Sequence, residues 1–349
     1  VMVHLETRSY TDRTRDLYTI TGRRVEYWQI TDGSRVSLMR TPQLSPRVWD
    51  VTAMAISDDG RYGITGGFYG AVSAASVWDL TTGEELRRFE GHTSPILAAG
   101  FSPNAASVYT LSQDSVRVWD LGDPRSLAQG RLSPPAREIA AIGFSPDQTE
   151  LFIAYDGIAM GRWSLATQRQ DGSRRFSTGA QVALAFSPVQ NRALVASVES
   201  LTLWNLDTVN EFLYRIPDVN PSTIEAIRFS QNGQLVYWMS NGRVTRWDVM
   251  ARQGVTFNGA QGTSLFAVDA LNENILTASE TRMLLTDVID RGTQEFRGFN
   301  GRIRTIDLSG GGDWVAAGVA EPDNAVMIWD ARTGVRRFDL RAHTAPVTV

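Results

Sequence analysis

The 349-residue chain contains no cysteine and no lysine. Without cysteine it has neither disulfides nor thiolate metal ligands, and cysteine usage does not indicate a redox compartment. All 34 basic residues are arginine. This bias fits codon usage in a GC-rich genome, or a surface that contacts carboxylates through guanidinium groups. The net charge of −4 favours neither a surface that coats nucleic acid nor an acidic tail.

Histidine is almost as scarce, since the chain has only His4, His92 and His343. This leaves no nucleophile–histidine pair for covalent catalysis and no multi-histidine metal site. The glycine-rich stretches 66–70 and 310–312 precede no helix and no lysine, so we interpret them as turns rather than phosphate loops. The sequence therefore predicts a protein that is not an enzyme and that needs no cofactor or metal.

The sequence also lacks any apolar run of about 18 residues, which predicts no membrane insertion. Residues 1–4 have neither the basic region nor the apolar region of a signal peptide. The chain does not begin with Met and stops inside a repeat unit at 342–349. We therefore expect a segment of a longer polypeptide. A cytoplasmic location is favoured, and a secreted or surface location stays open.

Tryptophan is the informative residue that is present. Seven of the ten tryptophans stand in strand-like runs at gaps of 50, 41, 44, 41, 43 and 82 residues. They are Trp28, Trp78, Trp119, Trp163, Trp204, Trp247 and Trp329. Thr286 fills the position that the last gap skips. A period of roughly 40–45 residues that closes on Trp-Asp is typical of a propeller array.

The clearest unit runs from 91 to 130. An apolar run at 95–101 predicts a buried inner strand, and 108–111 predicts a second strand. Residues 116–120 alternate apolar and polar side chains, as a half-buried third strand does. Turn residues separate the runs, and a more polar outer strand follows. Such a unit is one four-stranded blade, and the positions equivalent to the Trp strand number eight along the chain.

These units resemble WD40 repeats over essentially the whole chain. The strongest matches are Ser-Val-Trp-Asp-Leu at 76–80, Gly-His at 91–92, Val-Arg-Val-Trp-Asp at 116–120 and Val-Met-Ile-Trp-Asp at 326–330. The chain is identified as a divergent, bacterial-type member of the WD40-repeat β-propeller family. The resemblance implies an all-β fold and one domain over 1–349. It implies eight four-stranded antiparallel blades, with 2–8 as the first inner strand, or seven blades plus an extra unit.

In this family a His, a strand Ser or Thr, a turn Asp and the Trp form a hydrogen-bonded network, which rigidifies a blade when every polar group is satisfied. The one full set here is His92, Ser112, Asp114 and Trp119. Asp114 stands one residue nearer the Trp than the family pattern has it. Asp323 keeps the usual spacing to Trp329, but no His precedes that unit. We therefore expect most blades to depend on apolar packing.

The longest unit, between Trp28 and Trp78, carries insertions at 41–49 and 66–76. By the family resemblance both connections lie on one rim of the propeller. Loops often carry function, and Trp, Tyr and Arg are frequent interface anchors. The candidate partner-binding residues are therefore Arg47, Trp49, Phe68, Tyr69 and Arg137. The alternative is that Trp49 and Phe68 fill the groove between blades.

The sequence predicts a non-catalytic protein–protein interaction scaffold that uses rim loops and the mouth of the channel. Its partner is another protein or a domain of the same polypeptide. Nucleic acid is not expected, because the arginines are spread along the chain and balanced by 38 acidic residues. One alternative is a sensor or regulatory domain of a larger signalling or defence protein. A remote alternative is small-molecule binding in the channel, or a quinoprotein-like enzyme, which 81–86 faintly resembles.

Overall fold

A computed structural model describes most of the chain between Val3 and Leu340. The gaps in the description are 8–13, 22–23, 32–34, 41–49, 58–59, 70–71, 81, 103–104, 113–114, 123–129, 133–138, 148, 156–158, 165–166, 168, 176–180, 208–211, 270 and 272. Before Thr52 only the backbone is described. The described part is built from strands and one short 3-10 helix, η1 (Pro221–Thr223). No helix in it is long and apolar enough to cross a membrane.

The chain divides into two compact units, and each is described by itself. Unit 1 comprises Val1–Arg88 and Asn258–Val349, and unit 2 comprises Phe89–Phe257. The strands of unit 1 are β1 (Val3–Thr7), β2 (Thr14–Thr21), β3 (Arg24–Thr31), β4 (Arg35–Arg40), β5 (Asp50–Ile56), β6 (Tyr62–Tyr69), β7 (Val72–Asp79), β8 (Glu84–His92, which runs into unit 2), β25 (Leu265–Val268), β26 (Asn274–Ala278), β27 (Met283–Asp287), β28 (Thr293–Phe296), β29 (Ile303–Leu308), β30 (Trp314–Val319), β31 (Ala325–Asp330) and β32 (Arg336–Leu340).

The strands of unit 2 are β9 (Ile96–Phe101), β10 (Ser107–Ser112), β11 (Val116–Asp120), β12 (Gly130–Leu132), β13 (Ile139–Phe144), β14 (Glu150–Tyr155), β15 (Ala159–Ser164), β16 (Arg169–Arg175), β17 (Gln181–Phe186), β18 (Arg192–Ser197), β19 (Leu201–Asn205), β20 (Phe212–Ile216), β21 (Ile224–Phe229), β22 (Leu235–Ser240), β23 (Arg243–Asp248) and β24 (Gln253–Asn258). The described strands of the two units form eight four-stranded sheets, in each of which consecutive strands are neighbours. Each sheet is therefore an antiparallel meander with its turns alternating between two ends.

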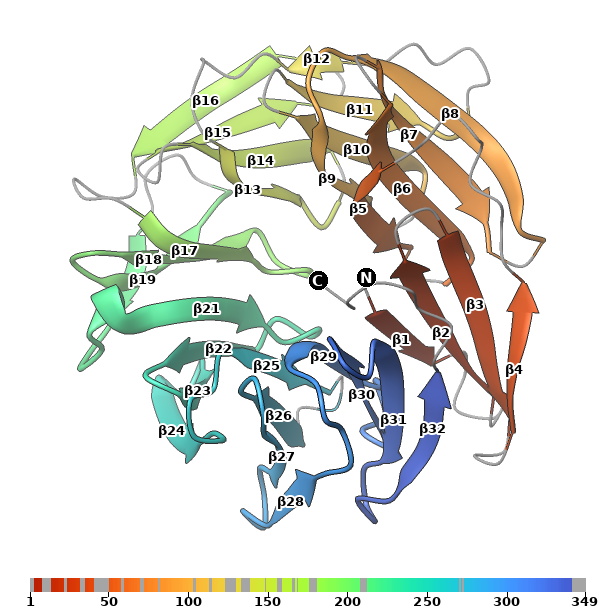
Figure 1. Ribbon diagram of the computed structural model, residues 1–349. Helices are drawn as coiled ribbons and strands as arrows, with labels where there is room; N and C mark the ends of the chain where they lie inside the picture. Colours follow the sequence, from red (N-terminus) through yellow and green to blue (C-terminus); the bar gives the residue numbers. More distant parts are fainter. Residues whose placement is uncertain are drawn as a thin grey trace. The chain divides into compact units, whose positions relative to one another are not determined.

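In unit 2 the first strands β13, β17 and β21 of three successive sheets lie side by side (Figure 1). Apolar clusters fill the layers between neighbouring sheets. The second strands β18 and β22 are buried along almost their whole length. A strand covered on both faces reads as a continuous apolar run, and this explains why these segments do not alternate.

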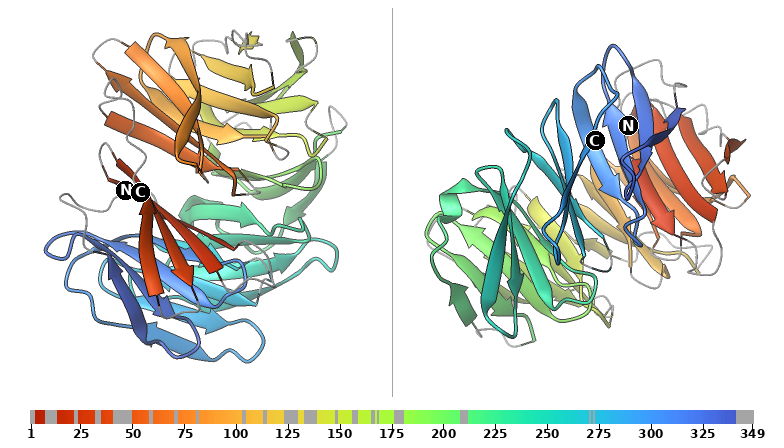
Figure 2. Two further views of the ribbon diagram at one scale, coloured as in Figure 1. Left: turned by 90° about the vertical axis from the view of Figure 1, so that its right-hand side faces the viewer. Right: turned by 90° about the horizontal axis from the view of Figure 1, so that it is seen from below.

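In unit 1 the first strand of the chain, β1, lies beside β29 and β30 of the last sheet. The sheets β25–β28 and β29–β32 share an apolar cluster in which Trp329 is fully buried. Figure 2 shows the sheets of each unit as separate layers. The first and last sheets of the sequence are therefore neighbours in space.

The structure confirms the predicted all-β fold of four-stranded antiparallel sheets. Residues 2–8, predicted as the first inner strand, contain β1. The number of blades in a closed ring, and a single domain over 1–349, stay predictions. The prediction of a turn at Gly66 and Gly67 is wrong, because both lie inside β6 opposite Ala75 and Ala74. Small residues on both strands let the two backbones pair there.

Candidate interaction surface

A buried hydrogen-bond network joins His92 to the Trp strand in unit 2. His92 Nε2 lies 2.7 Å from Thr110 Oγ1, which accepts a hydrogen bond of 2.9 Å from Trp119 Nε1. On the other side of the imidazole, Ser112 Oγ lies 2.7 Å from Nδ1. The Trp119 ring also stacks on Phe89, with centroids 4.7 Å apart. The structure therefore brings His92, Ser112 and Trp119 together, and Asp114 lies outside the described residues.

Thr110 was not among the sequence candidates, and strand register explains its role. It pairs with Arg117, two residues before the Trp, so its hydroxyl lies on the face that the indole covers. In the sheet β5–β8 the same register position holds Thr65, whose Oγ1 accepts a hydrogen bond of 2.9 Å from Trp78 Nε1. The same kind of Trp–Thr hydrogen bond therefore occurs in each of two consecutive sheets.

In the sheet β1–β4 the same register position holds Thr19, whereas four other described sheets with a Trp place an apolar residue there. These residues are Ile153, Val195, Trp238 and Ala317. The Trp163 ring packs in the apolar cluster between its sheet and β9–β12. The Trp28 position lies in β3, of which only the backbone is described. In three further sheets the indole N–H group donates a hydrogen bond to a different acceptor.

Each of these three acceptors is local to its own sheet or to a neighbouring segment. Trp204 Nε1 donates to Thr202 Oγ1 on its own strand at 2.8 Å. Trp247 Nε1 donates to Tyr214 Oη, from the adjacent sheet, at 3.2 Å. Trp329 Nε1 donates to the carbonyl of Arg297 at 3.1 Å. The Trp strands thus persist although the polar network around them has changed.

Asp323 has a partner of its own in the last sheet. This buried carboxylate accepts a hydrogen bond of 2.6 Å from the Asn300 backbone N–H and one of 3.3 Å from Asn300 Nδ2. Asn300 lies in the connection that precedes β29, where the family pattern has its His. An amide can donate to a carboxylate as a histidine does, so this pair ties the connection to the sheet.

The predicted rim is described in part. Phe68 and Tyr69 end β6, and the Phe68 side chain is half-buried. Most of the insertion 66–76 is strand rather than loop, since β6 and β7 pair as far as Tyr69 opposite Val72. Arg47, Trp49 and Arg137 lie outside the described residues, so their position relative to this hairpin stays a prediction.

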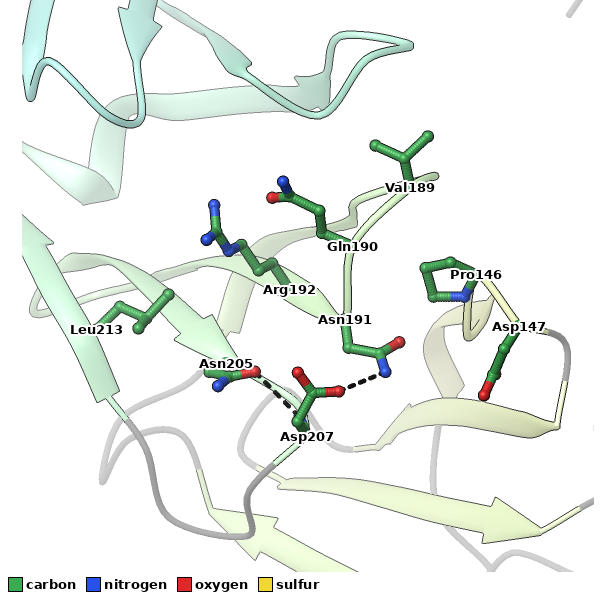
Figure 3. A pocket seen from close by; sticks show the side chains of 9 residues that line it. All are labelled: Pro146, Asp147, Val189, Gln190, Asn191, Arg192, Asn205, Asp207 and Leu213. Atoms are coloured by element: carbon green, nitrogen blue, oxygen red, sulfur yellow. Dashed lines mark hydrogen bonds between the residues drawn. The ribbon is translucent and has the colours of Figure 1, made fainter.

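A cavity of about 380 Å³ opens in unit 2, at the ends of the sheets β13–β16 and β17–β20 (Figure 3). It is lined by Pro146, Asp147, Val189, Gln190, Asn191, Arg192, Asn205, Asp207 and Leu213. Most of these residues lie in or beside the turns after the first and third strands, at one end of each meander, and Leu213 lies in β20. The predicted rim belongs to the opposite end of the meanders, where the connections before the first strand and between the second and third strands lie. Sequence reasoning missed the cavity, although the Ser-Pro turns that begin at Ser145 and Ser187 marked its position.

Hydrogen bonds fix the polar side chains of this cavity. Asn191 Nδ2 donates to Asp207 Oδ1 at 2.5 Å, and Asp207 N donates to Asn205 Oδ1 at 3.1 Å. The Ser145 hydroxyl donates to Asp147 at 2.6 Å and, as the largest cause, holds the pKa of that carboxyl below its ordinary value. The described lining residues offer amide, carboxylate and guanidinium groups, which can form hydrogen bonds with a ligand.

No cluster of three or more metal-binding side chains occurs in the part of the chain that the structure describes. A repeated four-stranded meander whose third strand carries a buried Trp defines a propeller-type repeat protein. The family model "WD domain, G-beta repeat" matches residues 83–120 and 292–330. These two segments contain Trp119 and Trp329. The chain therefore carries WD40 repeats at these two positions.

Several known proteins are similar to part of the chain. Pre-mRNA-processing factor 19 homolog 2 of Arabidopsis thaliana is 29% identical over 153 residues, 44% of this chain and 28% of the relative. The transcriptional corepressor LEUNIG_HOMOLOG of the same plant is 26% identical over 176 residues, 50% of this chain and 22% of the relative. Small ribosomal subunit protein RACK1y of Oryza sativa subsp. japonica is 28% identical over 151 residues, 41% of this chain and 42% of the relative. The chain thus spans less than half the length of each, and its predicted bacterial type stays untested.

Proposed function

We propose that this chain is a non-catalytic protein-interaction module, and that the β6–β7 hairpin with its neighbouring connections forms the rim that contacts the partner. The observation that carries this proposal is the length of the hairpin. The Tyr69–Val72 pair lies six positions beyond the Trp78–Gly63 pair. In the sheet β21–β24 the last pair, Ser240–Arg243, lies only four positions beyond the Trp247 pair.

Two additional residues per strand lengthen the hairpin by about 7 Å. Phe68 and Tyr69 stand in this additional part, and they are large side chains of the kind that anchor interfaces. The proposed rim also includes Arg47 and Trp49, in the connection before β5, and Arg137, in the equivalent connection before β13. A strand hairpin holds its side chains in fixed positions, which lowers the ordering entropy lost on binding.

The relatives support a role in assemblies. Their names describe a pre-mRNA-processing factor, a transcriptional corepressor and a ribosomal subunit protein. None of these three names states a catalysed reaction. The same relatives extend well beyond their matched part, and this favours a second candidate, a sensor or regulatory domain within a larger polypeptide. In either role the chain works by binding a partner protein.

The test is affinity capture from the native source with a hairpin variant, Phe68→Ala/Tyr69→Ala. The rim proposal expects the partners captured by the unaltered protein to be lost, with thermal stability retained. Leu86→Ala is the matched control, because Leu86 is an exposed apolar residue on β8 of the same sheet. Trp49→Ala and Arg137→Glu extend the test to the rest of the rim. If the hairpin variant captures the same partners with equal recovery, the rim is elsewhere.

A further inference from the structure

Each sheet ends in an outer strand whose far edge pairs with no other described strand. Such an edge exposes backbone N–H and C=O groups, and proteins usually protect it with charged side chains. Seven of the eight outer strands in the described sheets contain at least one charged residue. The exception is β24, Gln-Gly-Val-Thr-Phe-Asn, which contains none. The edge of β24 therefore lacks the usual protection against strand pairing.

β24 is exposed and yet firmly held. Five of its six residues are exposed, and only Phe257 is buried, at 6% exposure. Gly254 lies against the Trp247 ring, since a Cβ there would be 2.7 Å from Cε3. Thr256 Oγ1 lies 2.9 Å from Thr245 Oγ1 on β23. The strand thus offers a preformed edge that an incoming segment does not have to order.

An exposed methionine stands at the start of this edge. Met250 is 77% exposed, and it lies in the turn that joins β23 to β24. The turn is ordered, because Asp248 Oδ1 accepts hydrogen bonds from the N–H groups of Met250, at 2.8 Å, and Ala251, at 2.7 Å. A methionine side chain adapts its shape to an apolar partner. Val255, 37% exposed, adds apolar surface on the strand itself.

The next sheet shows what a protected edge looks like. Its equivalent turn exposes Ile289 at 73%, much as Met250 is exposed. Its outer strand β28, however, carries Glu295, which forms ion pairs with Arg282 at 2.9 Å and Arg297 at 2.6 Å. The hydrogen bond from Arg297, as the largest cause, lowers the pKa of Glu295, so this edge keeps its charge at neutral pH. Of these two sheets, only the one that ends in β24 combines an exposed apolar turn with an uncharged outer strand.

We propose that the outer edge of β24 is a strand-addition site for an extended, uncharged segment of a partner protein. This rests on the proposed role as an interaction module but does not depend on the β6–β7 hairpin. In this binding mode main-chain hydrogen bonds supply affinity, and side-chain pockets supply specificity. The segment would be rich in β-branched residues and would place an apolar side chain against Met250.

The length of the edge favours a short segment over a second copy of this chain. A strand of six residues is about 20 Å long. A standard interface between globular proteins uses roughly 20–30 residues on each side. β24 alone falls well short of this size, whereas a peptide of similar length can pair along all of it.

The test selects binders from a phage-displayed library of random linear peptides and follows them by hydrogen–deuterium exchange on the full chain. We expect the selected peptides to slow amide exchange in β24, and Val255→Lys to weaken their binding by about tenfold or more. Thr293→Lys, at an exposed position of β28, is the matched control and should leave binding unchanged. If the amide of Phe257 in β24 stays protected from exchange in the Val255→Lys variant, the variant still folds.

Three outcomes of the peptide selection overturn the proposal. The library yields no binder, the selected peptides protect residues outside β24, or they bind the Val255→Lys variant equally well. Concentration-dependent dimerisation that Val255→Lys abolishes would assign the edge to a second copy, and this also contradicts the proposal. Because the Phe68→Ala/Tyr69→Ala variant leaves β24 intact, failure of the rim and failure of the edge are separate results.

Discussion

Thr110 and Trp119 are joined by a hydrogen bond of 2.9 Å from the indole Nε1 to the threonine Oγ1, and both side chains are buried. The same hydroxyl lies 2.7 Å from His92 Nε2. Thr110 therefore connects the third strand of its sheet to the segment that enters the sheet. A single hydroxyl contacts two buried polar atoms, so its removal takes away the hydrogen-bond acceptor of the indole Nε1 and a partner of the imidazole Nε2.

We expect Thr110→Val to lower the free energy of unfolding by about 1–3 kcal/mol, because a buried polar group without a partner bears its full desolvation penalty. Valine keeps the shape of threonine, so the loss reports the hydroxyl rather than a cavity. Urea unfolding, followed by tryptophan fluorescence, measures the change. Thr110→Ser should recover most of the stability. An unchanged midpoint in Thr110→Val would show that the network contributes nothing.

Thr286, at the position of the missing Trp, should behave in the opposite way. Its hydroxyl is buried and has no hydrogen-bond partner among the described residues. Thr286→Val removes an unpaired polar group and keeps the branched shape, so we expect a gain of about 1 kcal/mol in the free energy of unfolding. Thr286→Ser, which keeps the hydroxyl and loses a methyl group, should not be stabilising. A loss of stability in the valine variant would reveal a partner for this hydroxyl.

The sequence predicted the strands and turns well because their signals are local. The apolar run that ends in Trp329 and Asp330 is bounded by turn residues, and it forms strand β31 as expected. The Trp119–Thr110 pair was missed because it depends on the register between two strands, which no local pattern encodes. Glycines 66 and 67 misled for a related reason, since their pairing with alanines on β7 outweighs the usual preference of glycine for turns.

The candidate sites divide in the same way. The unusual length of the unit around Phe68 was visible as spacing, but its form as a hairpin required the pairing of β6 with β7. The cavity at Asn191 and Asp207 draws its lining from several segments of two consecutive sheets, and these segments are not adjacent in the sequence. The uncharged stretch of β24 was readable in the sequence. Its meaning emerged only when the strand proved to be the outermost one of its sheet.

Tyr214 predicts a pH dependence of stability. Its hydroxyl donates to the carbonyl of Val249 at 2.9 Å and accepts from Trp247 Nε1 at 3.2 Å. Burial, the largest cause, raises the pKa of Tyr214 above its ordinary value. The folded state thus favours the neutral phenol. This contribution is fully present below the unfolded pKa of about 10, and it is lost as the pH rises through the folded pKa.

Tyr214→Phe should therefore lower the free energy of unfolding at neutral pH by about 1 kcal/mol, the net value of a hydrogen bond. It should also flatten the decline of stability above about pH 10. Urea midpoints measured from neutral to alkaline pH test both effects. Tyr109, whose pKa burial also raises, keeps its own alkaline contribution in this variant. An equal slope in the two proteins would assign the alkaline loss to other groups.

Gly301 should tolerate an added side chain far less well than Gly292. A Cβ at this position would overlap the carbonyl oxygen of Ala320 and lie 2.8 Å from that of Glu321. Both obstacles are backbone atoms, and the segment is held by the hydrogen bond of 2.8 Å from Ala320 N to the carbonyl of Arg302. The backbone at the start of β29 must therefore move to admit a methyl group. We expect Gly301→Ala to lower the free energy of unfolding by about 3 kcal/mol, the upper part of the range for overpacking.

Gly292 is the matched control in the same unit, because a Cβ there would meet nothing within 4 Å. Gly292→Ala should change stability by no more than about 0.5 kcal/mol. Thermal and urea unfolding of the two variants give the comparison, and equal stability would mean that the contact at Gly301 relaxes freely.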